Sequence, residues 1–140
     1  MQNINQHLGR AIKQAQHRHH RALDRQLAAV GTTLVQWDAL RAIERNPGAS
    51  GHLLATETFQ SDQAFGTLAN RLVAQELIFR NAGHGRRVEH HLTRKGQDVL
   101  AAGGRVADDM LKKSFAKLSR AERVTLLELL VRIGSEDLDS

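Results

Sequence analysis

The sequence contains no cysteine, a single proline (Pro47) and only 4% aromatic residues. The absence of cysteine excludes disulfides, thiolate metal sites, cysteine nucleophiles and a trigger based on cysteine oxidation. No apolar run approaches the roughly 18 to 20 residues that a membrane span requires. The first residues also lack the apolar segment of a secretory signal peptide. We therefore expect a cytoplasmic protein without a membrane partner.

Acidic residues are the minority charge, since 20 Lys and Arg stand against 15 Asp and Glu, for a net charge of +5. An excess of this size suits an anionic partner, although many ordinary proteins carry it. The length of 140 residues is that of one domain, and 41% hydrophobic residues are enough for a folded core. Frequent Ala, Leu, Arg and Gln, with little Pro, favour helices.

Apolar residues that recur every three or four positions predict a long first helix over about residues 5–30, ended by Gly31. The pair Thr33 and Gln36 has capping-box spacing and predicts a second helix to about Arg45. The turn signal Asn46-Pro47-Gly48 follows. Further elements are expected as helices over 51–58 and 62–75, strands over 77–80 and 88–92, and helices over 93–115 and 120–134. Gly103-Gly104 weakens the helix over 93–115 and suggests a bend there.

The two short helices over 51–58 and 62–75 are joined by about three residues, which is the spacing of a helix-turn-helix. The hairpin that follows completes a winged helix-turn-helix. With Phe65, Leu68 and Leu72 facing inward, the second helix presents an outward polar face. That face comprises Asp62, Gln63, Gly66, Thr67, Asn70 and Arg71. Gln and Asn side chains can pair with adenine, and Arg with guanine or phosphate, so this face suits the major groove of DNA.

The hairpin connection, residues 81–87, is polar, rich in glycine and basic. Arg86 and Arg87 lie at its tip, where they can enter a minor groove or hold its phosphates. From Arg80 to Lys95 there are five Lys or Arg residues and one Glu, which is most of the net positive charge of the chain. The basic hairpin makes DNA binding the better interpretation of the polar helix face, over a merely solvated one.

The order of these features resembles the MarR family of bacterial transcriptional regulators. The segments that carry the resemblance are Gln36-Trp37-Asp38-Ala39-Leu40-Arg41, Leu54-Ala55, Leu68-Ala69-Asn70-Arg71-Leu72, Leu77-Ile78-Phe79-Arg80, Arg86-Arg87-Val88 and Leu92-Thr93-Arg94-Lys95-Gly96. Three positions depart from the family pattern. Phe59 stands where a small residue is usual, Glu76 where Gly is expected, and Gly85 where an Asp usually precedes the Arg pair.

The expected fold is mainly α with a small β-hairpin wing, in a single domain over 1–140. Residues 31–95 would form the DNA-binding lobe, and 5–30 and 93–134 the dimerisation helices, because their apolar stripes exceed what one small lobe can cover. The resemblance implies a homodimer on a pseudo-palindromic operator in double-stranded DNA. The predicted DNA-binding residues are Ser61, Gln63, Ala64, Thr67, Asn70, Arg71, Arg86 and Arg87.

The resemblance also implies a repressor that a small aromatic or phenolic anion releases from DNA. The candidate pocket residues are Arg18, His19, Trp37 and Arg41. A core position for Trp37, and a hydrogen-bonded position in the dimer interface for His19, are the competing interpretations. No cofactor is expected.

Two alternatives remain open. The histidines at 17, 19, 20, 90 and 91 allow a metal-responsive regulator, although none shows the spacing of a zinc site and solvated or interface histidines are the simpler interpretation. The departures Phe59, Glu76 and Gly85 also allow a helical dimer that acts by protein contact without specific DNA binding. An enzyme is not expected, because the carboxylates are scattered and no phosphate-binding glycine motif is present.

Overall fold

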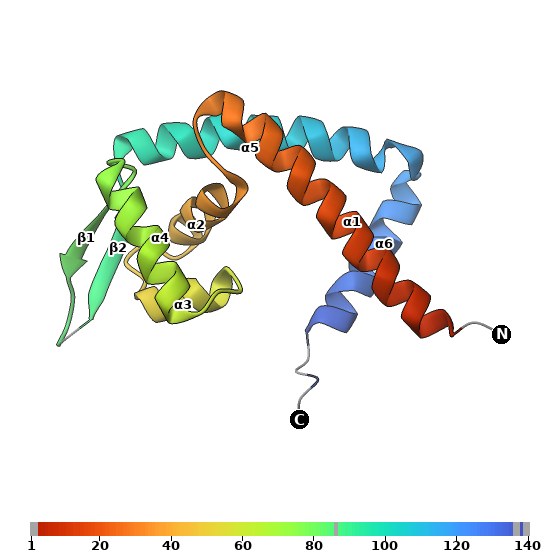
Figure 1. Cartoon of the computed structure of the whole chain (residues 1–140), viewed down its shortest axis with the longest axis horizontal. Coiled ribbons are helices and arrows are strands. Elements are labelled where there is room, and N and C mark those ends of the chain that lie inside the picture. Colours follow the sequence, from red (N-terminus) through yellow and green to blue (C-terminus); the bar gives the residue numbers. More distant parts are fainter. Residues whose placement is uncertain (1–2, 86, 136–137, 139–140) are drawn as a thin grey trace. The chain divides into compact units, whose positions relative to one another are not determined.

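A computed structural model gives the fold of residues 3–85, 87–135 and 138 (Figure 1). The elements are α1 (Ile4–Leu27), η1 (Ala28–Val30), α2 (Leu34–Arg45), α3 (Gly51–Glu57), α4 (Asp62–Ala74), β1 (Ile78–Ala82), β2 (Val88–Leu92), α5 (Arg94–Ser114), η2 (Phe115–Lys117) and α6 (Arg120–Gly134). They form two compact units, Met1–Ala107 and Asp108–Ser140, which we describe separately. The expected class, mainly helical with a β-hairpin, is confirmed.

The start of α2 is fixed by two hydrogen-bond acceptors. The Thr33 hydroxyl oxygen accepts from the backbone N–H of Gln36 at 3.2 Å, and the Asp24 carboxylate of α1 accepts from the N–H of Leu34 at 2.9 Å. The second half of the predicted capping box does not form, because the Gln36 amide oxygen accepts from the Thr32 hydroxyl instead. The capping of α2 therefore also joins it to α1.

The core of the first unit lies where α2, α3 and α4 meet the start of β1. Its largest fully buried side chains are Phe65, Leu27, Leu40, Ile43, Leu54, Leu72 and Ile78. Phe65, Leu68 and Leu72 are buried together on one side of α4, as their spacing predicts. The prediction of which side of α4 is buried, and therefore of which side faces outward, is confirmed.

Helices α3 and α4 both end in a Schellman motif. After α3, the N–H of Phe59 donates to Thr56 and that of Gln60 donates to Ala55. After α4, the N–H of Glu76 donates to Val73 and that of Leu77 donates to Leu72. The motif needs a residue with positive φ, and φ is 58° at Phe59 and 62° at Glu76. The two departures thus occupy the backbone positions that favour glycine.

The β-hairpin is antiparallel and lies beside α4 (Figure 1). Ile78 pairs with Leu92 and Ala82 with Val88, so β1 begins one residue later and ends two residues later than predicted, whereas β2 has the predicted bounds. The segment after α2 joins the hairpin, because the N–H of Gly48 donates to the carbonyl of His90 at 3.0 Å. The N–H of His90 donates in turn to Ala49 at 3.1 Å. These bonds fix the hairpin to the helical core.

Two glycines let α5 approach its neighbours within the first unit. A Cβ at Gly96 would collide with the carbonyl oxygen of Leu77. A Cβ at Gly103 would lie 2.5 Å from the Cδ1 of Trp37, whose indole N–H donates to Leu100 at 3.2 Å. The helix is continuous through Gly103 and Gly104, so the expected bend is absent there, and Gly103 alone serves packing against Trp37.

The second unit contains the last turns of α5, then η2 and α6. The predicted capping box at Ser119 is confirmed. The Ser119 hydroxyl accepts from the N–H of Glu122 at 3.1 Å, and the Glu122 carboxylate accepts from the N–H of Ser119 at 2.8 Å. Hydrogen bonds from the backbone N–H of Ser119, and to a lesser extent from its side chain, stabilise the charged carboxylate and lower the pKa of Glu122. Every described residue of α6 is exposed, including its leucines.

No helix within the described residues combines the length and the apolar character that crossing a bilayer demands.

Candidate nucleic-acid interface

The exposed face of α4 carries the side chains that the sequence predicts for DNA recognition. Ser61, Gln63, Ala64, Thr67, Asn70 and Arg71 are all exposed, whereas Phe65, Leu68 and Leu72 hold the opposite side in the core. Asp62 is exposed as well, and Gly66 is half-buried. The helix therefore offers donors, acceptors and one guanidinium to solvent from one surface.

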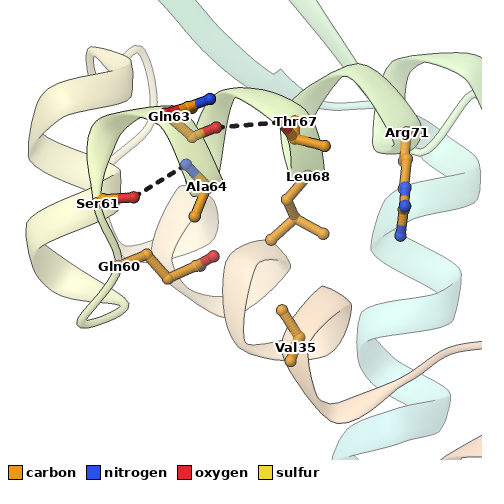
Figure 2. A pocket seen from close by; sticks show the side chains of 8 residues that line it. All are labelled: Val35, Gln60, Ser61, Gln63, Ala64, Thr67, Leu68 and Arg71. Atoms are coloured by element: carbon orange, nitrogen blue, oxygen red, sulfur yellow. Dashed lines mark hydrogen bonds between the residues drawn. The ribbon is translucent and has the colours of Figure 1, made fainter.

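Five of these side chains line a shallow groove of about 520 Å³ between α4 and the start of α2. The lining residues are Val35, Gln60, Ser61, Gln63, Ala64, Thr67, Leu68 and Arg71. Figure 2 shows Ala64 and Leu68 pointing from α4 toward Val35, with Arg71 at the far end of the groove. The polar residues thus surround a small apolar floor.

Both hydroxyl groups on this face, those of Ser61 and Thr67, already make a hydrogen bond to the backbone of α4. Ser61 caps α4, since its oxygen accepts from the N–H of Ala64 at 3.1 Å (Figure 2). Thr67 donates its proton to the carbonyl of Gln63 at 3.1 Å, which leaves its oxygen as an acceptor and its methyl group exposed to a ligand. Thr67 is therefore suited to accept a hydrogen bond from a base amino group, or to contact a thymine methyl.

Asn70 is held by a residue that the sequence analysis did not include among the candidates. The guanidinium of Arg80, on β1, donates to the Asn70 side-chain oxygen at 2.9 Å. Bidentate pairing with adenine needs both the oxygen and the amino group of an asparagine. The bond to Arg80 takes one of the two lone pairs of that oxygen and orients the Asn70 side chain toward β1, and Arg80 adds a second exposed cation beside α4.

The wing contributes Arg87, while Arg86 lies outside the described residues. The Arg87 guanidinium donates to the carbonyl of Gly48 at 3.0 Å. The family pattern has a carboxylate before the Arg pair, and here position 85 is a glycine with φ of 65°. The Gly48 carbonyl instead orients Arg87 by a hydrogen bond to one nitrogen, and its other donors remain available to a phosphate or a base.

A histidine and an aspartate join α3 to the first turn of α4. The Nδ1 atom of His52 lies 2.9 Å from a carboxylate oxygen of Asp62, and both side chains are exposed. Asp62 is the one carboxylate in the first turn of α4. A protonated His52 would offset the repulsion between this carboxylate and a phosphate at the helix N-terminus.

His90 is buried in the core of the first unit, a position that the sequence did not predict for any histidine. It is only 4% exposed, its Nδ1 lies 2.9 Å from the carbonyl of Ala49, and its ring meets Phe65 edge-on at 5.9 Å. Because a carbonyl accepts, Nδ1 carries the proton of the neutral ring. Burial lowers the pKa of His90 below its ordinary value, despite the bond to Ala49. A neutral His90 fixes the wing strand to the start of α3.

Two of the four candidate pocket residues, Trp37 and Arg41, are in contact in the first unit. The guanidinium carbon of Arg41 lies 4.5 Å from the centre of the Trp37 ring. A guanidinium nitrogen of Arg41 lies 3.7 Å from the carboxylate of Asp38. Trp37 is a core residue, 6% exposed. Burial raises the pKa of Asp38, and Arg41, Arg45 and His20 partly counter that effect. Arg18 is exposed on α1, and His19 is half-buried.

Among residues 3–85, 87–135 and 138, no three or more His, Asp or Glu side chains gather closely enough to hold a metal ion.

The helix pair α3–α4, the outward face of α4 and the hairpin beside it define a winged helix-turn-helix protein. Residues 30–87, which contain α2, α3, α4 and β1, match the model of the MarR family. No curated protein matches the sequence.

Solved structures share the fold over nearly the whole chain. A probable transcriptional regulator from Pseudomonas aeruginosa is 27% identical, with a TM-score of 0.82, over 94% of this chain and 99% of that one. A mutant MarR from Escherichia coli, complexed with operator DNA, is 23% identical, with a TM-score of 0.83 over 90% and 92% of the chains. A MarR family protein from Mycobacterium tuberculosis, in complex with p-aminosalicylic acid, is 22% identical, with a TM-score of 0.75 over 91% and 98%.

Proposed function

We propose that this protein is a homodimeric, sequence-specific DNA-binding repressor, released from its operator by a small aromatic or phenolic anion. One observation carries the DNA-binding part: the exposed face of α4 presents Gln63, Thr67 and Arg71 together, and the hairpin next to α4 carries the exposed cation Arg87. Base-edge readers and phosphate-binding cations in this arrangement suit a helix in the major groove with a wing beside it.

The homodimer is supported by apolar side chains that the single chain leaves uncovered. On α1, Ile4, Leu8 and Ile12 are exposed along one stripe. On α6, the exposed large apolar residues are Val124, Leu126, Leu127, Leu129, Leu130, Val131 and Ile133. A helix that is apolar over most of its circumference is normally buried. We infer that residues 5–30 and 93–134 are the dimerisation helices and that 31–95 is the DNA-binding lobe.

A two-fold dimer would present two copies of α4 to successive major grooves on one side of DNA. The half-site centres would then be about 10 base pairs apart, and the operator would be pseudo-palindromic. Gln63 and Thr67 would select bases, and Arg71, Arg86 and Arg87 would bind phosphate or the minor groove. Ser61 and Ala64, at the start of α4, would lie against the sugar-phosphate backbone of the DNA.

The effector part is supported by the relative in complex with p-aminosalicylic acid, a phenolic carboxylate. Arg18, His19 and Arg41 supply the cation or donors that an anion needs, and Trp37 supplies an aromatic wall. Ligand binding would favour a dimer whose two copies of α4 no longer match the groove spacing. The anion then acts by shifting the equilibrium between two conformations of the dimer, without contacting DNA.

Binding of fluorescent duplexes, tiled across the DNA upstream of the gene, tests the proposal. We expect one tile to bind tightly, to survive competitor DNA and to be released by salicylate. Arg71→Ala should weaken this complex, whereas Arg105→Ala, which removes the same charge from an exposed position of α5, should not. Equal loss in both variants would indicate attraction by net charge alone, and contradict the assigned interface.

Sedimentation of two matched α6 variants tests the dimer. Leu127 is 63% exposed on the apolar side of α6, and the neighbouring Glu128 lies on its polar side with Thr125 and Arg132. Leu127→Arg should give monomers at micromolar concentration, while Glu128→Arg should leave the dimer intact. A monomeric wild-type protein would overturn the proposed assembly.

A further inference from the structure

Phe59 combines two unfavourable features in one residue. Its side chain is 97% exposed, the highest value among the large apolar side chains that the structure describes. Its φ of 58° lies in the left-handed region, which a bulky residue adopts only at a cost in free energy. Backbone strain of this kind concentrates at functional sites, where the observed outlier suggests a role.

The local fold does not require a phenylalanine at this position. Phe59 is the positive-φ residue of the Schellman motif that ends α3, and glycine satisfies that motif without strain. Of the other four described positive-φ positions, three are glycine (Gly31, Gly48 and Gly85) and the fourth is Glu76. A large ring therefore stands where glycine would fit the backbone without strain.

The position of Phe59 is next to the predicted DNA-reading surface. Gln60 and Ser61, which follow it, both line the groove along α4, and Ser61 is the N-cap of that helix. Two residues of chain span at most about 7 Å, so the ring begins close to the N-terminus of α4. In a helix-turn-helix, this end of the second helix is the end that approaches the base edges.

We propose that Phe59 is a DNA contact, its ring covering the carbon surface of the deoxyribose and thymine methyl groups at the start of the recognition helix. This inference rests on the proposed function. A nucleic-acid occupant is favoured over a protein because the residues that flank Phe59 in the chain are polar. The neighbours Glu57, Gln60 and Ser61 are polar, whereas the centre of a protein interface gathers several apolar anchors.

An apolar contact predicts a specific signature in binding. Covering a phenylalanine ring is worth about a tenfold to a hundredfold change in affinity. The contact releases no counterion, so truncating the ring should lower affinity without changing the slope of log K against log salt. Loss of a phosphate-binding arginine would change both quantities.

Three variants separate this role from a purely structural one. Phe59→Gly removes both the ring and the strain, Phe59→Ala removes the ring and keeps most of the strain, and Glu76→Gly relieves the same strain at the end of α4. We expect Tm to rise by roughly 2 to 4 °C in Phe59→Gly and Glu76→Gly, but not in Phe59→Ala. The probe is the duplex tile that the wild-type protein binds most tightly.

On that tile, Phe59→Gly and Phe59→Ala should both lose at least about tenfold in affinity at an unchanged salt slope. Glu76→Gly should stay within about twofold of wild type, so stabilisation alone cannot explain the loss. Wild-type affinity in both Phe59 variants would overturn the inference and leave the proposed function intact. A wild-type protein that binds no DNA specifically would instead contradict the proposed function, and with it this contact.

Discussion

The guanidinium of Arg80 donates a hydrogen bond to the side-chain oxygen of Asn70 at 2.9 Å, and so joins the first wing strand to the outward face of α4. Asn70 looks like an adenine reader by its residue type and its place on the helix. The bond to Arg80 instead makes it a residue that positions a cation beside the proposed recognition surface. The side chains that remain open for base recognition are chiefly those of Gln63 and Thr67.

We predict that Gln63→Ala changes which operator variants are bound, whereas Asn70→Ala weakens all of them by a similar, smaller factor. A bidentate base contact is worth about 1–3 kcal/mol of discrimination, and the bond from Arg80 holds the Asn70 oxygen toward the wing strand instead of a base. Binding to a library of single-base operator variants measures both effects. A base preference that shifts in Asn70→Ala would mean that the Arg80 bond opens when DNA binds.

The wing arginine gives a second prediction. Arg87→Ala should weaken DNA binding and reduce the salt slope by about one, because one cation leaves the interface. The hydrogen bond to Gly48 is lost too, at a cost of about 0.5–1.5 kcal/mol in folding. Arg87→Lys serves as the control that keeps the charge. If affinity and salt slope are both unchanged in Arg87→Ala, the wing assignment is wrong.

Adjacent glycines of α5 provide a matched test of packing. Gly103→Ala should destabilise the protein by about 1–3 kcal/mol, because the new Cβ would lie 2.6 Å from the Trp37 indole nitrogen. At Gly104 no atom lies within 4 Å of an added Cβ, so Gly104→Ala should stabilise α5 by up to about 1 kcal/mol. Urea denaturation of the two variants measures the difference. Equal effects would contradict the contact between Trp37 and α5.

His90 predicts a loss of stability in mild acid. Its pKa is lowered in the folded state from the ordinary value of 6.5, so the unfolded chain binds more protons as pH falls. The contribution of neutral His90 to the free energy of unfolding should therefore be fully present above pH 6.5. It should be lost as pH falls through 6.5 toward the folded pKa. His90→Asn keeps a donor for Ala49 but does not titrate. Its stability should change less between pH 7.5 and 5.5, and an equal pH dependence in both proteins would exclude His90 as the source.

Much of the fold follows from local patterns in the sequence. The spacing of Phe65, Leu68 and Leu72 predicts which face of α4 is buried, and Ser61 and Ser119 cap helices as expected. The departures at Phe59 and Glu76 also carried information, since both have the positive φ that glycine prefers. Periodicity and capping act within a few residues, which is why they can be predicted.

Contacts between distant residues could not be predicted in the same way. Nothing in the sequence around His90 shows that its ring would be buried against Phe65, or that Arg80 would take the oxygen of Asn70. The weakness at Gly103 is visible in the sequence, but its cause, the Trp37 ring, lies on another helix. Each of these depends on tertiary packing, which brings together residues from separate elements.

The most direct test of the central claim is selection of bound DNA from whole-genome fragments by the purified wild-type protein at physiological salt. We predict enrichment of a single pseudo-palindromic motif whose half-sites are centred about 10 base pairs apart. Substitution of Gln63 by alanine should then alter the enriched bases within each half-site. Weak, uniform recovery of all fragments that disappears as salt rises would contradict the account, because it would leave only non-specific attraction between a basic protein and DNA.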